Sequence, residues 1–330
     1  MRILVTGGAG FIGSHIVEHF QGRAEVRVLD NLRSGFKHNL AGLQHEFIEG
    51  SILDRDAVRR AVQGVDYIFH LAAMISVPES MAKPIECNEI NTHGTLVVLE
   101  EAAQAGVKKL VLSSSAAIYG DNPTVPKLET MVPEPKSPYA ITKLDGEYYC
   151  KMFADEGRLQ TACLRYFNVF GPRQDPKSQY AAAVPIFIHR ALKHEPITIY
   201  GDGEQTRDFI YVKDIAAANA FFATQSSATG VFNVAYGRKI TINELCSIIC
   251  RLTDSRSEIK YAAERAGDVK HSMAAVDRLR VAGFTPTGSL AEGLASTVKF
   301  FQSRAGGAQI NTVEERITAQ GSKTGMAKRG

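Results

Sequence analysis

A tyrosine and a lysine four positions apart, Tyr139 and Lys143, have a spacing that suggests chemistry. They follow Ser137-Pro138 at the expected start of a helix, where positions i and i+4 share one face. A phenol is a poor base at neutral pH because its ordinary pKa is about 10. A neighbouring ammonium stabilises the phenolate and lowers that pKa. The pair therefore predicts a general base.

A run of serines at 113–115 supports this interpretation. It ends a predicted strand shortly before the helix of Tyr139, and hydroxyls there can bind a reacting oxygen. Alone, the tyrosine–lysine spacing is common on amphipathic helices, and a serine run is typical of a turn. Together they predict an active site in which Ser115, or alternatively Ser114, holds the reacting oxygen.

The N-terminal stretch MRILVTGGAGFIG would place a cofactor beside these groups. Its apolar run ends at three glycines, and an apolar helical pattern follows. Gly7 permits a sharp turn, Gly10 lets the backbone approach a pyrophosphate, and Gly13 lets helix and strand pack closely. The start of the helix offers free N–H groups and a positive dipole end to an anion. A tight turn of any α/β protein is the alternative for the glycines alone.

A second predicted strand ends at Asp30, at the distance expected for a dinucleotide site. A carboxylate there accepts hydrogen bonds from a ribose hydroxyl and repels a 2′-phosphate, so it predicts NAD rather than NADP. Arg33 lies nearby and could soften that preference. We interpret it instead as a solvated loop residue.

Strands and helices alternate along the first half of the chain. This order predicts an α/β fold with a doubly wound parallel (Rossmann) sheet, whose ligands lie beyond the carboxyl ends of the strands. The NAD-binding domain is expected over 1–171, with return segments near 208–237. The predicted strands are 45–50, 65–73, 107–115, 159–171 and 231–237, and the predicted helices are 54–64, 88–106 and 138–157.

Beyond Gly171 the alternation breaks. Short strands and helices near 181–193, 241–252 and 289–303 predict a smaller C-terminal α/β substrate lobe over 172–304. Residues 305–330 have little apolar content, and we expect a mobile tail there.

Composition excludes several classes of protein. The 330 residues carry a net charge of only +3, which does not suggest a nucleic-acid surface. No segment is long enough to span a membrane, and the N-terminal apolar run is too short for a signal peptide. The five cysteines form no CxxC pattern, which indicates a cytoplasmic protein without structural zinc or another metal.

Several motifs together resemble the extended short-chain dehydrogenase/reductases and, more narrowly, the NAD-dependent nucleotide-sugar 4-epimerases. The motifs are TGGAGFIG, HLAA (70–73), NTHGT (91–95), SSSAAIYG (113–120), YAITK (139–143) and RYFNVFGPRQ (165–174). The resemblance runs from Met1 to about Phe300. It implies an NAD site formed by Gly7, Gly10, Phe11, Ile12, Gly13, Asp30, Asn31, Ser51, Ile52, Ala72, Asn91, Tyr139, Lys143 and Phe167.

Two of these residues have further implied roles. Lys143 would also bond the nicotinamide ribose. Ser51 departs from the family, which usually has an aspartate that accepts from the adenine amino group. A serine could still bond the ring, but more weakly.

A second set of residues resembles the UDP-binding pattern of these enzymes. Arg207 and Arg265 would clamp a pyrophosphate through planar guanidinium groups, although a surface ion pair is the alternative for either arginine alone. Asp268 would accept from a ribose hydroxyl, and Asn168 would reach a phosphate or a sugar hydroxyl. The implied substrate site comprises Ser115, Asn168, Tyr180, Val184, Tyr200, Arg207, Arg265, Asp268 and Ser272.

The residues after Ser115 bear on the reaction. Related dehydratases and decarboxylases carry an acidic residue there, whereas this chain has Ala116 and Ala117. The pattern therefore favours simple epimerisation. Tyr139 would take the O4 proton while NAD takes the C4 hydride, and the transient 4-keto sugar would turn over and receive the hydride on its other face. NAD would be regenerated, and we expect it to stay bound.

The position of Ser272 bears on the sugar. In the family a tyrosine there narrows the pocket, whereas a small residue admits an N-acetyl group. Ser272 therefore favours UDP-GlcNAc and UDP-GalNAc, with UDP-glucose and UDP-galactose as further substrates. A UDP-glucuronate 4-epimerase, a dehydratase or decarboxylase, and a catalytically silent NAD-binding scaffold are the alternatives. The resemblance also implies a homodimer, paired through helices near 88–106 and 138–157.

Overall fold

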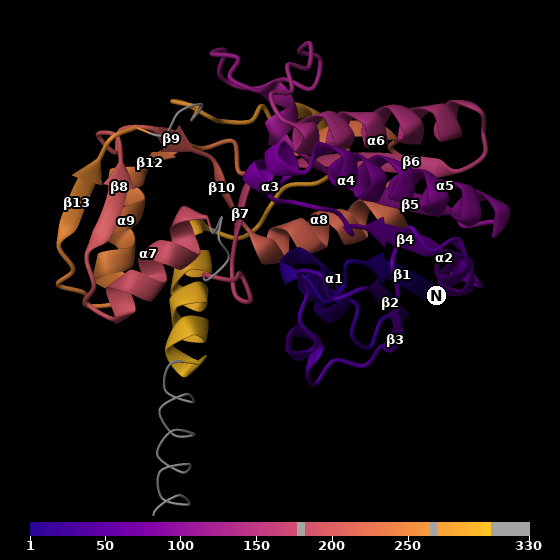
Figure 1. Cartoon of the computed structure of the whole chain (residues 1–330), viewed down its shortest axis with the longest axis horizontal. Helices are drawn as coiled ribbons and strands as arrows, with labels where there is room; N and C mark the ends of the chain where they lie inside the picture. Colours follow the sequence, from indigo (N-terminus) through magenta and orange to yellow (C-terminus); the bar gives the residue numbers. More distant parts are fainter. Residues whose placement is uncertain (177–181, 265–268, 305–330) are drawn as a thin grey trace, which may run out of the picture.

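The computed structural model describes residues 1–176, 182–264 and 269–304. The chain forms a larger lobe around a parallel sheet, with a smaller lobe beside it (Figure 1). Three predicted substrate residues, Tyr180, Arg265 and Asp268, lie outside the described residues, and so does the expected tail over 305–330.

The larger lobe contains a seven-stranded sheet in the order β11-β6-β5-β4-β1-β2-β3. Every neighbouring pair of strands is parallel. The predicted doubly wound sheet is therefore confirmed, including the late strand β11 that returns to its edge beside β6. The strands are β1 (Arg2–Thr6), β2 (Glu25–Asp30), β3 (Glu46–Glu49), β4 (Tyr67–His70), β5 (Lys109–Ser115), β6 (Gln160–Tyr166) and β11 (Gly230–Val234).

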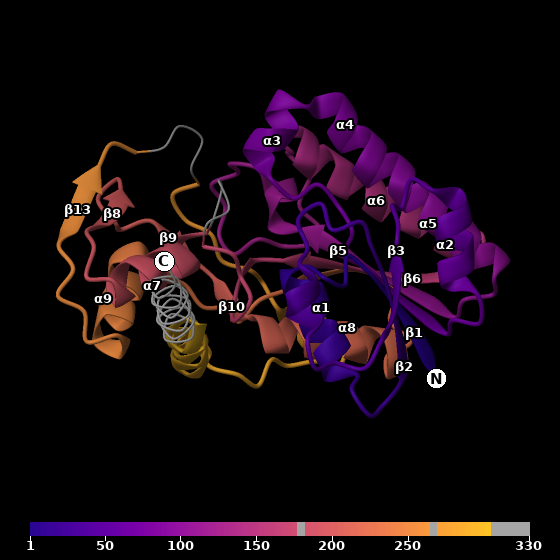
Figure 2. The same ribbon diagram turned by 60° about the horizontal axis from the view of Figure 1, so that its bottom comes forward.

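Helices cover both faces of this sheet (Figure 2). One face carries α1 (Phe11–His19) and α8 (Val212–Thr224), and the other carries α2 (Arg55–Val62), α5 (Gly94–Gln104) and α6 (Pro138–Asp155). Within β1, Ile3 and Val5 enter one apolar cluster, and Leu4 enters the opposite one. Burial on both faces explains why the strands are continuous apolar runs.

The predicted helix over 88–106 is interrupted. The chain forms α3 (Val77–Ala82) and α4 (Pro84–Asn88), then a π turn, η2 (Glu89–His93), before α5 begins. Within the turn, the Asn91 side chain accepts from the Met74 N–H at 2.7 Å and donates to its carbonyl at 3.0 Å. The irregular turn therefore ties the segment after β4 to the helical layer. Two short 3-10 helices are η1 (Lys37–Leu40) and η3 (Ala116–Tyr119).

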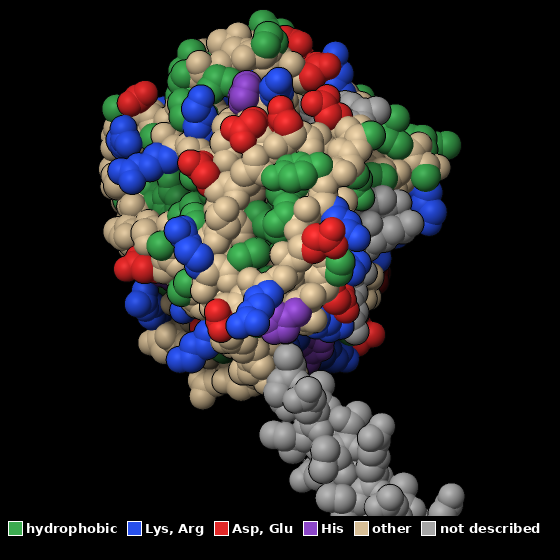
Figure 3. All heavy atoms as spheres, turned by 90° about the vertical axis from the view of Figure 1, so that its left-hand side faces the viewer, with side chains coloured by type: hydrophobic (Ala, Val, Ile, Leu, Met, Phe, Trp, Pro, Cys, Tyr) green, Lys and Arg blue, Asp and Glu red, His purple; other side chains and the backbone are tan. Residues whose placement is uncertain are grey.

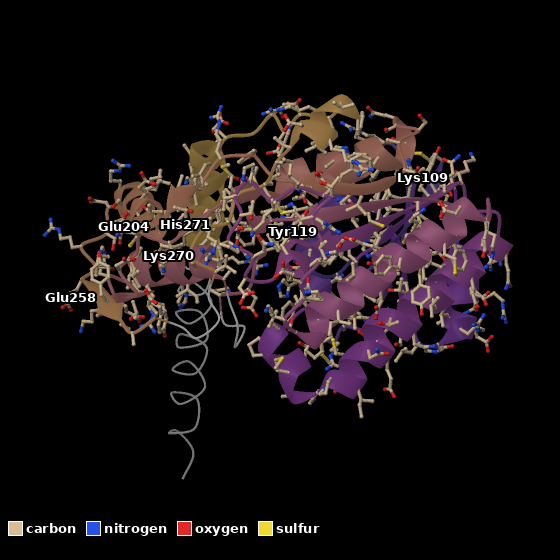
Figure 4. The ribbon with its side chains drawn as sticks, turned by 90° about the horizontal axis from the view of Figure 1, so that it is seen from above. Lys109, Tyr119, Glu204, Glu258, Lys270 and His271 are labelled. Atoms are coloured by element: carbon tan, nitrogen blue, oxygen red, sulfur yellow. The ribbon has the colours of Figure 1, made fainter. Side chains whose placement is uncertain are left out.

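The smaller lobe packs its elements around a third apolar cluster. In it, β8 pairs with β13 and β9 pairs with β12, while β10 pairs with β7 beside the large sheet. Lys270 and His271 lie in this lobe near Glu204, far from Lys109 at the other end of the molecule (Figure 4). Its elements are β7 (Asn168–Phe170), α7 (Ala183–Leu192), β8 (Ile197–Tyr200), β9 (Thr206–Arg207), β10 (Phe209–Tyr211), β12 (Ile240–Thr241), α9 (Ile242–Leu252), β13 (Ile259–Ala262) and the helical residues 290–304. The short helix α10 (Asp277–Val281) packs instead against β11 of the larger lobe.

The chain crosses between the lobes more than once, because α8 packs against α1 in the larger lobe although it follows elements of the smaller one. The predicted boundary between the NAD-binding domain and the substrate lobe, at 171/172, therefore stays a prediction. On the end face of the smaller lobe, acidic and basic side chains are interspersed (Figure 3). Within the described ranges, no helix combines the length and the apolar character needed to cross a membrane.

A buried ion pair joins α6 to β6. The Arg165 guanidinium donates to both carboxylate oxygens of Glu147, at 2.8 and 2.7 Å, and both side chains are almost fully buried. Ser114 donates to the same carboxylate at 2.5 Å, and Arg165 also lies over the Tyr119 ring. Removing one partner would leave the other charge buried and uncompensated.

We expect Glu147→Gln to lower the free energy of unfolding by about 3–5 kcal/mol, because Arg165 would keep its buried charge without a counter-charge. Chemical denaturation measures this change. The matched control is Glu156→Gln, since the Glu156–Arg158 pair is exposed to solvent and its loss should cost less than about 1 kcal/mol. Equal losses in both variants would contradict the prediction.

Candidate active site

A cavity of about 610 Å³ lies at the carboxyl ends of the central strands. It brings together most of the predicted cofactor residues and the predicted catalytic residues. Those that line it are Gly7, Gly10, Phe11, Ile12, Gly13, Asp30, Asn31, Ser51, Ile52, Ala72, Ser115, Tyr139, Lys143 and Phe167.

The start of α6 positions Tyr139 and Lys143. The Ser137 hydroxyl caps the helix by accepting from the Ala140 N–H, and Pro138 occupies the first turn. The Lys143 ammonium donates to the Ser113 carbonyl at 2.7 Å and lies 5.8 Å from the centre of the Tyr139 ring. The cation and the phenol are thus held side by side at the end of β5.

Burial dominates the electrostatics of this pair. It raises the pKa of Tyr139, and the neighbouring Ser115 hydroxyl opposes that effect. Burial also lowers the pKa of Lys143, to about 8. The desolvation of the phenolate is the largest effect on the Tyr139 pKa, and the expectation that Lys143 lowers this pKa stays a prediction.

The three serines have different environments. Ser113 provides its carbonyl to Lys143, and the Ser114 hydroxyl is buried and donates to Glu147. The Ser115 hydroxyl accepts from the Ala117 N–H at 3.1 Å. It lines the cavity together with Tyr139 and lies beside the Tyr139 phenol. Of the two candidates for holding a reacting oxygen, Ser115 is the one whose hydroxyl lies beside Tyr139, whereas the Ser114 hydroxyl is bound to Glu147.

The glycine turn fits a dinucleotide pyrophosphate. Gly7 has a positive φ of 70°, and a Cβ there would lie 2.8 Å from the Ala72 nitrogen. A Cβ on Gly13 would overlap the Gly7 carbonyl oxygen. At Gly10, the N-cap of α1, no side chain caps the helix. The first N–H groups of α1 therefore remain available to an anion.

Asp30 lies at the ribose end of the predicted site. Its carboxylate is buried and accepts from the Ala9 N–H at 2.9 Å and the Leu32 N–H at 2.8 Å. Each oxygen keeps a lone pair for a ribose hydroxyl. Arg33 also lines the cavity, and it pairs with Glu79 and Glu86. Arg33 is the exposed loop residue that the sequence predicted, with the addition of these two ion pairs.

Two lining residues were not assigned a role from the sequence, although the motif RYFNVFGPRQ contains them. Arg173 has a left-handed backbone (φ 67°), and its guanidinium pairs with Glu18 of α1. The Arg173 Nη1 is buried and finds no hydrogen-bond partner among the described residues; the same holds for Oε1 of Gln174. An orphaned cationic donor on the cavity wall fits an anionic cofactor.

The remaining described candidates lie outside the cavity wall. Asn91 lies behind it, where it holds the Met74 backbone. Asn168 donates to the Asp208 carbonyl where β7 meets β10. Val184 is buried in α7, and Tyr200 ends β8 in the smaller lobe.

Arg207 and Ser272 are neighbours through Thr206. The Thr206 carbonyl accepts from the Ser272 N–H at 3.1 Å and from the Arg207 guanidinium at 2.9 Å. The structure therefore brings these two predicted substrate residues together, in the lobe that faces the catalytic pair.

The site is typical of a dinucleotide-binding enzyme, because a glycine turn and an acidic residue lie at the carboxyl ends of a parallel sheet. The Ser115–Tyr139–Lys143 group beside them has the residue types that could remove a proton from a hydroxyl. The sequence pattern of the NAD dependent epimerase/dehydratase family matches residues 3–235, and the chain belongs to this family. The family expected from the motifs is confirmed, and so is NAD as the cofactor.

Solved structures and curated proteins extend this similarity. The UDP-N-acetylglucosamine 4-epimerase of Methanobrevibacter ruminantium M1, solved with UDP-N-acetylmuramic acid, is 44% identical, with 92% of this chain and 98% of that chain covered and a TM-score of 0.89. The UDP-glucose 4-epimerase of Thermus thermophilus, solved with NAD, is 39% identical over 92% and 99% of the chains, with a TM-score of 0.84. The UDP-glucose 4-epimerase of Mycolicibacterium smegmatis is 38% identical over 92% of this chain and 100% of its own length. Decarboxylases of UDP-sugar acids also match.

We expect Gly13→Ala to reduce the amount of NAD that copurifies with the protein by at least tenfold, because the new methyl group would force the first turn of α1 away from the Gly7 carbonyl. The nucleotide released by denaturation can be quantified by chromatography. The control is Gly22→Ala, which adds a Cβ at a positive φ of 71° but meets no atom within 4 Å. Full NAD content in the Gly13 variant would contradict the assignment of the glycine turn (Gly7, Gly10 and Gly13) as the pyrophosphate-binding site.

Proposed function

We propose that this enzyme interconverts UDP-GlcNAc and UDP-GalNAc by inverting the configuration at C4, and that it also accepts UDP-glucose and UDP-galactose. The observation that carries this proposal is the Ser115–Tyr139–Lys143 group at the cavity, followed by Ala116 and Ala117 without a carboxylate.

Each protein group has a distinct role in the proposed reaction. Tyr139 removes the O4 proton and later returns it, while Ser115 holds O4 within reach of the phenol. When bound, NAD supplies a reversible hydride acceptor and a cationic ring. Lys143, fixed by the Ser113 carbonyl, supplies a second positive charge beside the phenolate.

The smaller lobe supports the choice of substrate. Arg207 would neutralise the pyrophosphate of UDP, and the adjacent Ser272 is small enough to leave room for an N-acetyl group. A relative that is 44% identical acts as a UDP-N-acetylglucosamine 4-epimerase, which fits the same assignment. We propose that Tyr180, Arg265 and Asp268 complete this site.

The alternative functions are another enzyme that acts on UDP-sugar acids and a scaffold without catalytic activity. A UDP-glucuronate 4-epimerase would use the same catalytic group, and related decarboxylases act on UDP-sugar acids. A silent NAD-binding scaffold would not require the catalytic group to be intact, so Ser115, Tyr139 and Lys143 favour an enzyme over that alternative.

An exposed apolar surface supports the expected homodimer. It is formed by Met81 and Ile85 on α3 and α4 and by Ile141, Tyr148 and Met152, which follow one face of α6. Because α3 and α4 pack against α6, these side chains form neighbouring parts of one surface. We propose a second copy of the chain as its occupant. The five free cysteines support the proposed cytoplasmic location.

The holoenzyme should convert UDP-GlcNAc into UDP-GalNAc without net release of NADH, and Tyr139→Phe should lower kcat by about 10²–10⁴-fold because the proton acceptor is lost. Nuclear magnetic resonance of the product mixture and absorbance at the NADH band measure both. The variant should keep its bound NAD, which separates a catalytic defect from a binding defect.

Other results would assign a different reaction to the enzyme. Stoichiometric NADH build-up, a 4-keto-6-deoxy product or loss of carbon dioxide would exclude simple epimerisation. Faster turnover of UDP-glucuronate than of UDP-GlcNAc would establish the uronate enzyme instead.

We expect Ser272→Tyr to lower kcat/KM for UDP-GlcNAc at least tenfold more than for UDP-glucose, because the larger ring would fill the space proposed for the N-acetyl group. Parallel kinetics with both substrates measure the ratio. Ser272→Ala is the control, since it stays small and should preserve the ratio. An equal loss for both sugars in the tyrosine variant would refute the proposed gate.

A further inference from the structure

Arg33 occupies a position from which it could determine the choice of cofactor. It follows the ribose-binding Asp30 by three residues, after a turn in which Leu32 has a φ of 59° and Asn31 accepts from the Arg33 N–H. Both Asp30 and Arg33 line the cofactor cavity. In dinucleotide sites of this fold, an arginine near the ribose is the group that accommodates the 2′-phosphate of NADP.

In this structure, the Arg33 guanidinium is already occupied at both ends. Its Nη1 lies 2.5 Å from a carboxylate oxygen of Glu86, and its Nη2 lies 2.9 Å from one of Glu79. These partners come from α4 and α3, 53 and 46 residues further along the chain. The planar guanidinium therefore presents its two donor ends to carboxylates rather than to a phosphate.

The surroundings hold the two glutamates in place. The Glu79 N–H donates to the Ser76 hydroxyl, which caps α3, and Glu86 also pairs with Lys83 at 3.3 Å. The side chains of Arg33, Glu79 and Glu86 are only about one-third exposed. They form one ion-pair cluster, in which Arg33 is the member that lines the cavity.

We propose that Glu79 and Glu86 are specificity determinants that exclude NADP by withholding Arg33 from a 2′-phosphate. Two barriers then act together. Asp30 repels the phosphate directly, and the paired glutamates occupy Arg33, the arginine that this loop could offer to the phosphate. The proposal concerns the cofactor alone and does not depend on which sugar the enzyme uses.

Binding measurements on the holoenzyme test this inference. Wild type and Glu79→Gln/Glu86→Gln would be incubated with an equimolar excess of NAD and NADP until the bound nucleotide has exchanged completely and its composition no longer changes. The bound nucleotides would then be released by denaturation and quantified by chromatography. We expect the bound NADP-to-NAD ratio to rise at least tenfold in the double variant and to an intermediate extent in each single variant. Adding Arg33→Ala should abolish the gain, because the released guanidinium is its cause.

The comparison is repeated in a variant that lacks the Asp30 charge. The same comparison in Asp30→Asn removes the direct repulsion, so the contribution of the released arginine would be visible even where Asp30 dominates. The matched control is Glu100→Gln, because Glu100 binds Arg55 at 2.5 Å in a comparably exposed pair outside the cavity wall. An unchanged ratio in both backgrounds, or a gain that survives Arg33→Ala, would overturn the proposal.

Discussion

One charge-assisted hydrogen bond fixes the reaction centre: the Lys143 ammonium donates to the Ser113 carbonyl at 2.7 Å. It joins the catalytic helix α6 to the carboxyl end of β5, where Ser115 lies two residues further on. Because Lys143 and Tyr139 share one face of α6, fixing the lysine also fixes the phenol relative to the Ser115 hydroxyl. The bond also partly compensates the burial that lowers the pKa of Lys143 to about 8.

A second layer of buried polar contacts supports this arrangement. The Glu147–Arg165 pair joins α6 to β6 one turn after Lys143, and it also binds the Ser114 hydroxyl. The alternation of side chains along β5 places Ser114 toward this pair and leaves its neighbours on the other side. A network that is satisfied in one arrangement stabilises that arrangement specifically, since any displacement leaves a charge unpaired.

The fold and the local motifs could be predicted from the sequence because they depend on local patterns. Apolar runs predicted the strands, and Ser137-Pro138 marked the start of α6. The choice between Ser114 and Ser115 could not be made, because it depends on Glu147, which lies 33 residues further on and whose orientation is set by Arg165. The ion pairs of Arg33 could not be predicted for the same reason, because its partners follow it by 46 and 53 residues. The π turn at 89–93 could not be predicted, because the helical spacing of apolar residues continues on both sides of it.

The proposed reaction explains why one lobe would bind the cofactor and the other would anchor the substrate. A cofactor that stays bound requires a rigid site, and here its residues lie on one large sheet whose apolar clusters fill both faces. A sugar that must present opposite faces in successive half-reactions requires an anchor away from the reacting carbon. The proposed contact of Arg207 with the pyrophosphate would meet that requirement, because Arg207 belongs to a short paired segment of the other lobe and not to the cavity wall. Chemistry and substrate choice can therefore change independently, since the catalytic group and the proposed gate have no side chain in common.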